Sequence, residues 1–183
     1  MKTKQTFDVC TLVSDSIVIR QLASSDQEAI VTAGNDDQMQ KWFPLPFPYT
    51  TENAKWFISD FAPERQHGGT GLVSAIDLDG KFAGVIDIKR AEWRGRSCEI
   101  SYWTSPWARS KGVSTSALVI LSHWIIQEMG FQRLEVRVAP GNLASQKVAE
   151  KAGFVREGIA RNAGFTNHGR IDLIIYSRIP SDH

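Results

Sequence analysis

The residues best suited to bind an anion lie in the loop Arg109-Ser110-Lys111-Gly112, between a predicted strand and a predicted long helix that begins near Val113. The first four N–H groups of a helix have no partner inside it, and the helix dipole places about half a positive charge there. Arg109 and Lys111 add formal charge, and Gly112 lets the backbone approach a ligand closely. The loop therefore predicts a phosphate site, although Gly112 alone would equally suit a tight connection.

A second group of polar residues stands where a further helix is predicted to begin, over residues 143–152. Asn142 is a favoured N-cap residue, and Ser145 follows at the third helical position. Both residues are also ordinary for the start of any helix. The pattern alone therefore leaves a functional and a structural interpretation open.

The elements that position these residues alternate between strands and helices. Period-two patterns predict strands over residues 16–22, 71–76, 81–89, 97–103, 134–138, 154–155 and 171–179. Helical spacing predicts helices over residues 27–33, 50–61, 113–129 and 143–152, the first with N-cap residues at 24–26. Three prolines exclude a regular helix over residues 42–49, and residues 159–170 are predicted to be an irregular insertion. This order predicts an α+β domain with one mixed, mostly antiparallel sheet of about seven strands and helices on both faces.

The composition is that of an ordinary globular protein and predicts a single domain over residues 1–183. A net charge of +1 at pH 7 argues against a nucleic-acid partner. The two cysteines, Cys10 and Cys98, form neither a disulfide framework nor a zinc site, which favours a reducing cytoplasm and no bound metal. Because we find no signal peptide and no apolar run of membrane-spanning length, we expect no membrane partner.

Two longer segments resemble the GCN5-related N-acetyltransferases (GNAT), specifically the RimJ/RimL-like branch that acetylates ribosomal proteins. In EISYWTSPWARSKGVSTSAL, residues Arg109 to Ser114 correspond to the family's pyrophosphate loop, Arg/Gln-x-x-Gly-x-Gly/Ala, with serine at its last position. The second segment contains Asn142-Leu-Ala-Ser145 and Glu150-Lys-Ala-Gly-Phe154, which match the branch's Asn-x-x-Ser and Glu-Lys-x-Gly-Phe signatures. The paired motifs are specific at this separation, and the resemblance covers nearly the whole chain.

The resemblance implies a sheet that splays between its fourth and fifth strands, near Trp103 and Val138, to admit the pantetheine arm of acetyl-CoA. The acetyl group would pass to an amine by direct attack, with backbone N–H groups stabilising the oxyanion. Ser145 would protonate the departing thiolate, since its hydroxyl can donate one hydrogen bond. The residues that the resemblance assigns to cofactor binding are Trp103, Thr104, Ser105, Arg109, Ser110, Lys111, Gly112, Val113, Ser114 and Asn142.

The general base is the part of the resemblance that this sequence matches least. Some close relatives carry a glutamate at the position of Gly164, so Glu99 is the best remaining carboxylate, ahead of Glu157 and His168. Glu99 would equally suit a structural ion pair with a nearby arginine. An α-amine with a pKa of about 7.7–8.0 is about one-tenth neutral at pH 7, whereas a lysine amine is neutral in about one molecule in 2,500. The missing glutamate therefore favours an α-amine, or another weakly basic amine, over lysine.

The sequence leaves the acetyl acceptor open. The predicted substrate-binding residues are Trp42, Phe47 and Phe165, although the aromatic run over residues 42–49 would also suit plain packing against the sheet. An open groove between this run and residues 159–170 would suit a protein N-terminus, and a closed pocket would suit a small amine such as an antibiotic or a metabolite. A third hypothesis is a non-catalytic regulator that binds acyl-CoA. A homodimer is also left open.

Overall fold

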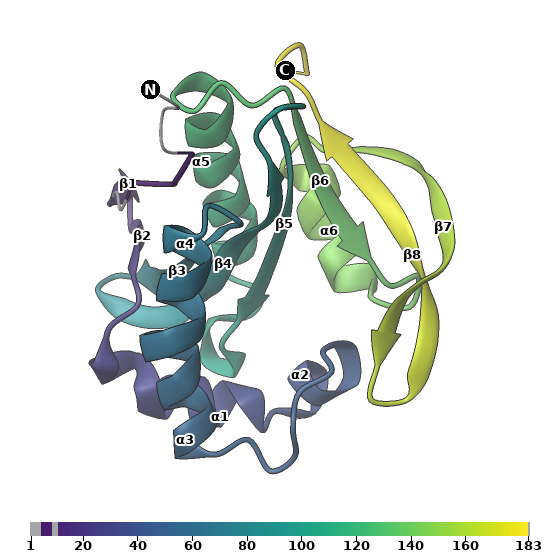
Figure 1. The fold of residues 1–183 in the computed structure, drawn as a ribbon. Coiled ribbons are helices and arrows are strands. Elements are labelled where there is room, and N and C mark those ends of the chain that lie inside the picture. The colour runs from purple at the N-terminus through teal and green to yellow at the C-terminus, as the bar shows by residue number, and fades with distance from the viewer. Residues whose placement is uncertain (1–4, 9–10, 183) are drawn as a thin grey trace.

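The structure, a computed structural model, describes residues 5–8 and 11–182, so Cys10 lies outside the described part of the chain. One mixed sheet runs through the molecule in the order β1-β2-β3-β4-β5-β6-β8-β7 (Figure 1). Every neighbouring pair is antiparallel except β5–β6, which confirms the predicted sheet type. The strands are β1 (Leu12–Ser14), β2 (Ile17–Gln21), β3 (Leu72–Leu78), β4 (Lys81–Glu92), β5 (Ser97–Thr104), β6 (Arg133–Val138), β7 (Val155–Thr166) and β8 (Gly169–Arg178).

Two parts of the sheet differ from the prediction. The strand beyond the expected seven is β1, whose three residues are too few for an alternating pattern to be recognised. Residues 159–170 are not irregular but belong to a long hairpin of β7 and β8. Register shifts between Arg156 and Gly158 and between Ala160 and Gly164 interrupt its pairing. Such bulges offset the alternation of side chains, which explains why the segment does not show a strand pattern.

Helices cover both faces of the sheet, as predicted (Figure 1). They are α1 (Gln27–Gly34), α2 (Asp37–Trp42), α3 (Thr51–Trp56), α4 (Ala62–His67), α5 (Val113–Gln127) and α6 (Leu143–Lys151). A π-helical turn (Phe57–Phe61) joins α3 to α4, and 3-10 turns lie at Ser24–Asp26 and Pro106–Ala108. None of the described helices is both long and apolar enough to cross a membrane.

The first helices show two further differences. The residues expected to cap α1 instead form the 3-10 turn, where the Asp26 carboxylate accepts the N–H of Ala23 at 2.8 Å. The helix α2 was not predicted; its N-cap is Asp36, whose carboxylate accepts the N–H of Gln38 at 3.1 Å. The chain after α2, over residues 43–49, is non-helical, as the prolines require.

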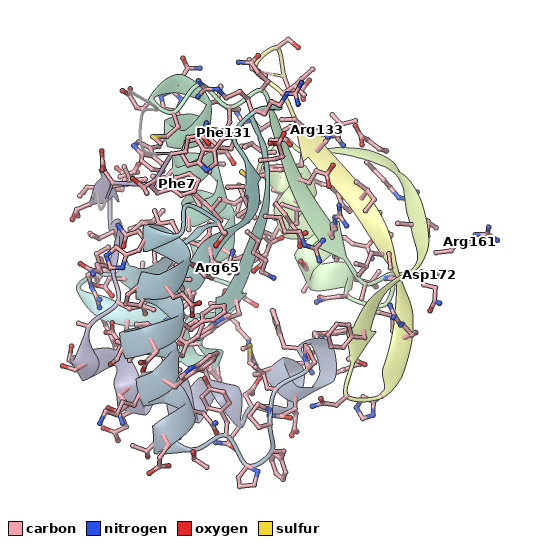
Figure 2. The ribbon with its side chains drawn as sticks, viewed as in Figure 1. Phe7, Arg65, Phe131, Arg133, Arg161 and Asp172 are labelled. Carbon is pink, nitrogen blue, oxygen red and sulfur yellow. The ribbon has the colours of Figure 1, made fainter. Side chains whose placement is uncertain are left out.

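The long helix α5 is anchored in the larger of two hydrophobic core clusters. Leu118, Leu121 and Ile125 are almost fully buried there. Burial of each leucine or isoleucine side chain contributes about 1.5–3 kcal/mol, so this packing fixes the start of α5 relative to the sheet. Phe7 and Phe131 pack together in the same cluster, with ring centroids 6.0 Å apart (Figure 2). The second cluster lies under α1, α3 and α4.

Candidate active site

The strands β5 and β6 pair only at their beginnings and then separate. The paired residues are Ser97 with Arg133, Cys98 with Leu134 and Glu99 with Glu135. Within the described residues, Ile100 to Thr104 on β5 have no further partners on β6. A cavity of about 840 Å³ lies here, lined by both strands. The predicted splay is therefore confirmed, and it leaves two facing strand edges with open backbone groups.

The walls of the cavity come from two groups of elements. One group is the loop before α5 together with the first residues of α5 and one side of α6, from Ala144 to Lys151. The other is α2, the chain that follows it and the β7–β8 hairpin. In Figure 1, β6, β8 and β7 diverge from β5, and α2 lies below the place where they separate.

The loop before α5 leaves the start of the helix open. Gly112 is the N-cap residue with a φ of 77°, a left-handed conformation that glycine adopts without strain. No described side chain caps this helix, and the N–H of Ser116 bonds to the C=O of Gly112 at 2.9 Å. The N–H groups of Val113, Ser114 and Thr115 therefore lack helical partners. A Cβ added at Gly112 would meet no atom within 4 Å, so a ligand has room to approach.

The end of β5 is tied to the elements on both sides. The hydroxyl groups of Thr104 and Ser114 are hydrogen-bonded, which fixes the start of α5 against the strand. The N–H of Ser105 donates to the C=O of Ala83 at 2.7 Å and is not free for a ligand. Because successive N–H groups of a strand point in opposite directions, that of Thr104 is directed away from β4 and toward the separated edge.

Arg109 is held by an acidic residue that is distant in the sequence. Its two terminal guanidinium nitrogens bond the carboxylate of Asp36, one of them at 3.2 Å. Hydrogen bonding to Arg109, helped by its charge, lowers the pKa of Asp36 below its ordinary value. The pair ties the predicted phosphate loop to the N-terminus of α2. Sequence reasoning missed Asp36, because nothing local connects positions 73 residues apart.

Ser145 lies beside the hydroxyl group of Tyr102. Its Oγ is 3.1 Å from the Tyr102 oxygen, and the Tyr102 O–H also donates to the Ser145 C=O at 3.1 Å. The Asn142 side chain accepts the N–H of Ser145 at 3.1 Å, so Asn142 is the N-cap of α6, as predicted. Burial raises the pKa of Tyr102 to about 12, so this hydroxyl stays protonated at neutral pH. Sequence reasoning missed Tyr102, although its place beside Trp103 in the segment EISYW, part of the first segment that resembles the family, is an available signal.

The carboxylate of Glu99 lines the cavity and is shared by two arginines. Arg90 bonds it at 2.9 Å, and the Nε of Arg137 lies 3.5 Å away. Its side chain is 12% exposed. The contacts of Glu99 in this structure are therefore those of a structural ion pair, which was the alternative to a role as general base.

The two weaker candidates for the base lie away from the cavity. Hydrogen bonds from Arg133, labelled in Figure 2, and from Ser177 lower the pKa of Glu157 to about 2. A carboxylate with so low a pKa is a weak base. His168 is exposed in the turn between β7 and β8, and neither residue lines the cavity.

Eight of the ten residues predicted to bind the cofactor line the cavity. They are Trp103, Thr104, Arg109, Ser110, Gly112, Val113, Ser114 and Asn142. The other two are directed elsewhere. Ser105 is buried, and the Lys111 ammonium lies 4.9 Å from the centroid of the Trp107 ring.

The aromatic residues predicted to bind the acceptor are only partly brought together. Trp42 and Phe165 line the cavity, whereas Phe47 is 75% exposed and does not. The tip of the β7–β8 hairpin touches the chain after α2, because the amide of Asn167 donates to the C=O of Leu45 at 2.8 Å. The two segments expected to border the acceptor therefore meet across this side of the cavity.

Known proteins are similar to this chain in sequence and in fold. The family described as "Acetyltransferase (GNAT) domain" matches residues 16–155. The ribosomal-protein-serine acetyltransferase of Escherichia coli (strain K12) is 31% identical over 170 residues, which are 91% of this chain and 94% of that protein. RimJ of Mycobacterium smegmatis, solved with CoA-disulfide, has a TM-score of 0.83 at 20% identity over 94% of this chain and 87% of its own. The microcin C7 self immunity acetyltransferase MccE, solved with acetyl-CoA and AMP, has a TM-score of 0.82 at 23% identity over 91% and 93%.

The separated parallel strands, beside a helix start that no described side chain caps, are the features that the resemblance to the GNAT family implies. Together with these matches they define an acetyltransferase fold. The chain belongs to the GNAT acetyltransferase family and is an N-acetyltransferase whose relatives include ribosomal-protein acetyltransferases.

Proposed function

We propose that this enzyme transfers the acetyl group of acetyl-CoA to the α-amino group of a protein N-terminus. The observation that supports this most directly is the separated β5–β6 pair beside the uncapped start of α5. Acetyl-CoA carries a diphosphate, which suits a helix start with free N–H groups. Its amide-containing arm suits open strand edges, which bind extended ligands as an added strand. When bound, it supplies an activated acetyl thioester.

The residues at the start of α5 hold the diphosphate. The N–H groups of Val113 and Ser114 donate to its oxygens, and the free space beside Gly112 lets it approach the backbone. Arg109 adds positive charge from an orientation that Asp36 fixes. The N–H of Thr104, directed toward the opening, stabilises negative charge on the thioester oxygen.

Ser145 protonates the departing thiolate in this proposal. Its neighbour Tyr102 keeps its own proton at neutral pH and donates it to the Ser145 C=O at 3.1 Å, which holds the serine hydroxyl beside the tyrosine oxygen. Asn142 holds the backbone of Ser145 in place. Tyr102 and Asn142 thus fix the position from which Ser145 delivers its proton to the sulfur.

The acceptor that fits best is an α-amine. Gly164 replaces the glutamate of some relatives, and Glu99 is already shared by two arginines, so neither supplies a strong base. An α-amine needs little help to lose its proton near neutral pH, unlike lysine. The similarity to the E. coli ribosomal-protein-serine acetyltransferase supports a protein N-terminus as the acceptor. The proposal places the enzyme in the cytoplasm, where ribosomal proteins are made.

One contact favours a second candidate, acetylation of a small amine. The hydrogen bond between Asn167 and the C=O of Leu45 partly closes the acceptor side of the cavity. A closed site suits a small molecule better than a peptide chain, which must enter and leave across the surface.

An assay that measures thiol release from acetyl-CoA distinguishes acetylation of a protein N-terminus from acetylation of a small amine. The purified protein would be incubated with peptides that begin with serine or alanine and, in parallel, with spermidine. We expect kcat/KM to be about tenfold or more higher for the peptides, or about 1.4 kcal/mol in transition-state stabilisation. The reverse preference would select the second candidate. If calorimetry shows that acetyl-CoA binds but none of these amines causes release of the CoA thiol, the protein would instead be a non-catalytic regulator.

A further inference from the structure

Asp87 is a buried carboxylate that has no cationic partner among the residues that the structure describes. The residue is 8% exposed and lies within β4. Two other buried carboxylates, Asp26 and Asp77, share Arg20 at 2.8 and 2.7 Å. In residues 5–8 and 11–182, no lysine, arginine or histidine nitrogen lies within 4.0 Å of Asp87; its hydrogen-bond donor is the hydroxyl of Ser101.

The burial of an unpaired carboxylate lowers the stability of the folded protein, so stability does not explain this arrangement. A buried carboxylate is normally paired with a cation, because burial penalises the isolated charge. Among the described residues, the cations of the adjacent elements form no ion pair with Asp87, although the Arg65 Nε is buried without a hydrogen-bond partner. Lys89 stands opposite Glu99 in the register, and Arg65 of α4 donates to the C=O of Ile88 at 3.0 Å. A positive, proton-donating group that arrives with a ligand would complete the site.

Ser101 connects Asp87 to the cavity. The two residues are direct partners in the β4–β5 register, so their side chains project from the same face of the sheet. Ser101 lines the cavity, whereas Asp87 lies behind it. Because the serine hydroxyl has a single proton and donates it to Asp87, its oxygen can only accept a hydrogen bond from a ligand. Ser101, the member of the pair that lines the cavity, therefore suits a ligand that donates a hydrogen bond, such as an amine.

The position of Ser101 matches the direction from which an amine must attack. Neighbouring side chains of a strand point to opposite faces, so Ser101 and Tyr102 lie on opposite sides of β5. Tyr102 meets Ser145, the residue that we assign to the leaving thiolate. Trp103, on the same face as Ser101, packs on Phe82 of β4, with ring centroids 5.9 Å apart. The nucleophile and the leaving group are thus served from opposite faces of one strand.

We propose that Ser101 and Asp87 together receive the acceptor's α-ammonium group and remove one of its protons. A proton passes from the ammonium nitrogen to the Ser101 oxygen while the serine proton passes to Asp87. This leaves a neutral amine, an intact serine and a protonated Asp87, which later releases its proton to solvent. The amine then forms the C–N bond as the C–S bond breaks. Ser145 gives its proton to the departing sulfur, and the second proton of the attacking nitrogen then passes to Ser145 and restores its hydroxyl. Protons and charges therefore balance.

The proposal rests on the proposed acetyl transfer, and one set of variants tests the two separately. Ser101→Ala, Asp87→Asn, the double variant and Ser101→Thr would be compared with the wild type, using acetyl-CoA and a serine-initiated peptide. Ser74→Ala is the matched control, because Ser74 is buried in β3 and does not line the cavity. Acetyl-CoA affinity would be measured by calorimetry and stability by thermal unfolding. A wild type without peptide acetylation would contradict the proposed function itself.

At about pH 6.5, where the α-amine is mostly charged, Ser101→Ala and Asp87→Asn are each expected to lower kcat/KM about tenfold or more. The double variant should be no worse than the poorer single variant, because the two residues act in series. Ser101→Thr keeps the hydroxyl and should stay within about threefold of the wild type. The deficits should shrink to about threefold at about pH 9, where the α-amine is largely neutral.

Each of several results would overturn the proposal. The first is a normal kcat/KM in Ser101→Ala, or losses that multiply in the double variant. The second is an Asp87→Asn loss that is equal at both pH values and accompanied by weaker acetyl-CoA binding or a lower melting temperature, which is the behaviour of a structural pair. Changes in Ser74→Ala as large as those in Ser101→Ala would lead to the same conclusion.

Discussion

The guanidinium group of Arg109, in the loop before α5, bonds the carboxylate of Asp36 at the N-terminus of α2. The loop borders the proposed diphosphate site, and α2 carries Met39 and Trp42 into the wall of the cavity. One ion pair therefore joins the loop proposed to hold the coenzyme to an element proposed to face the acceptor.

Replacement of Asp36 separates the two roles of this carboxylate. Asp36→Ala removes both the cap of α2 and the partner of Arg109, and we expect the free energy of unfolding to fall by about 1–2 kcal/mol. Asp36→Asn retains a capping oxygen and should lose only about 0.2–1 kcal/mol. Urea denaturation at pH 7 measures both. Equal losses would show that the cap of α2 contributes nothing.

Gly112→Asp is expected to abolish measurable acetyl-CoA binding while the fold survives. The cause is repulsion between the added carboxylate and the diphosphate, because aspartate tolerates the left-handed φ of 77° and an added Cβ would meet no atom within 4 Å. The matched control is Gly112→Asn, because asparagine tolerates this conformation and carries no charge. We expect the control to retain binding in calorimetry. Unchanged affinity in the aspartate variant would remove this loop from the diphosphate site.

Ser145→Ala is expected to lower kcat at least about tenfold, a loss of about 1.4 kcal/mol of transition-state stabilisation, with similar acetyl-CoA affinity. Tyr102→Phe should show a smaller loss in the same direction, because it removes a hydrogen bond to Ser145 but not the proton donor. Steady-state kinetics with a serine-initiated peptide measure both effects. Normal turnover in Ser145→Ala would exclude it from the mechanism.

The ion pair of Glu157 predicts a pH-dependent stability. Its folded pKa of about 2 lies below the ordinary value of 4.5, so the stabilisation is fully present above 4.5 and is lost as pH falls toward 2. Because its side chain is 42% exposed and screened by solvent, we expect Glu157→Gln to lose only about 0.5–1 kcal/mol at pH 7. Denaturation at a series of pH values should show the variant and the wild type converging in acid. Glu28→Gln, at an exposed position of α1, is the control, and a pH-independent difference would contradict the prediction.

The parts of the site that the sequence predicted are encoded locally. The loop that ends at Gly112 and the N-cap at Asn142 lie within a few residues of the helices that they begin, and the structure has both helix starts there. The contacts that sequence reasoning missed join distant positions. Ser145 meets Tyr102 across 43 positions, and Asp87 meets Ser101 only because the β4–β5 register aligns them. Single-sequence patterns carry little information about such registers when bulges interrupt the pairing.

In the part of the chain that the structure describes, the strands β5 and β6 are joined by only three residue pairs, and we expect this to affect how long the enzyme survives. A bound coenzyme that satisfies the open backbone groups would bridge the two halves of the sheet and mask edges that favour aggregation. A ligand that binds only the folded state adds about 2.7 kcal/mol of stability at a hundredfold excess over its Kd. Cellular acetyl-CoA would then set the abundance of the enzyme as well as its rate, because starvation for the coenzyme hastens unfolding and proteolysis.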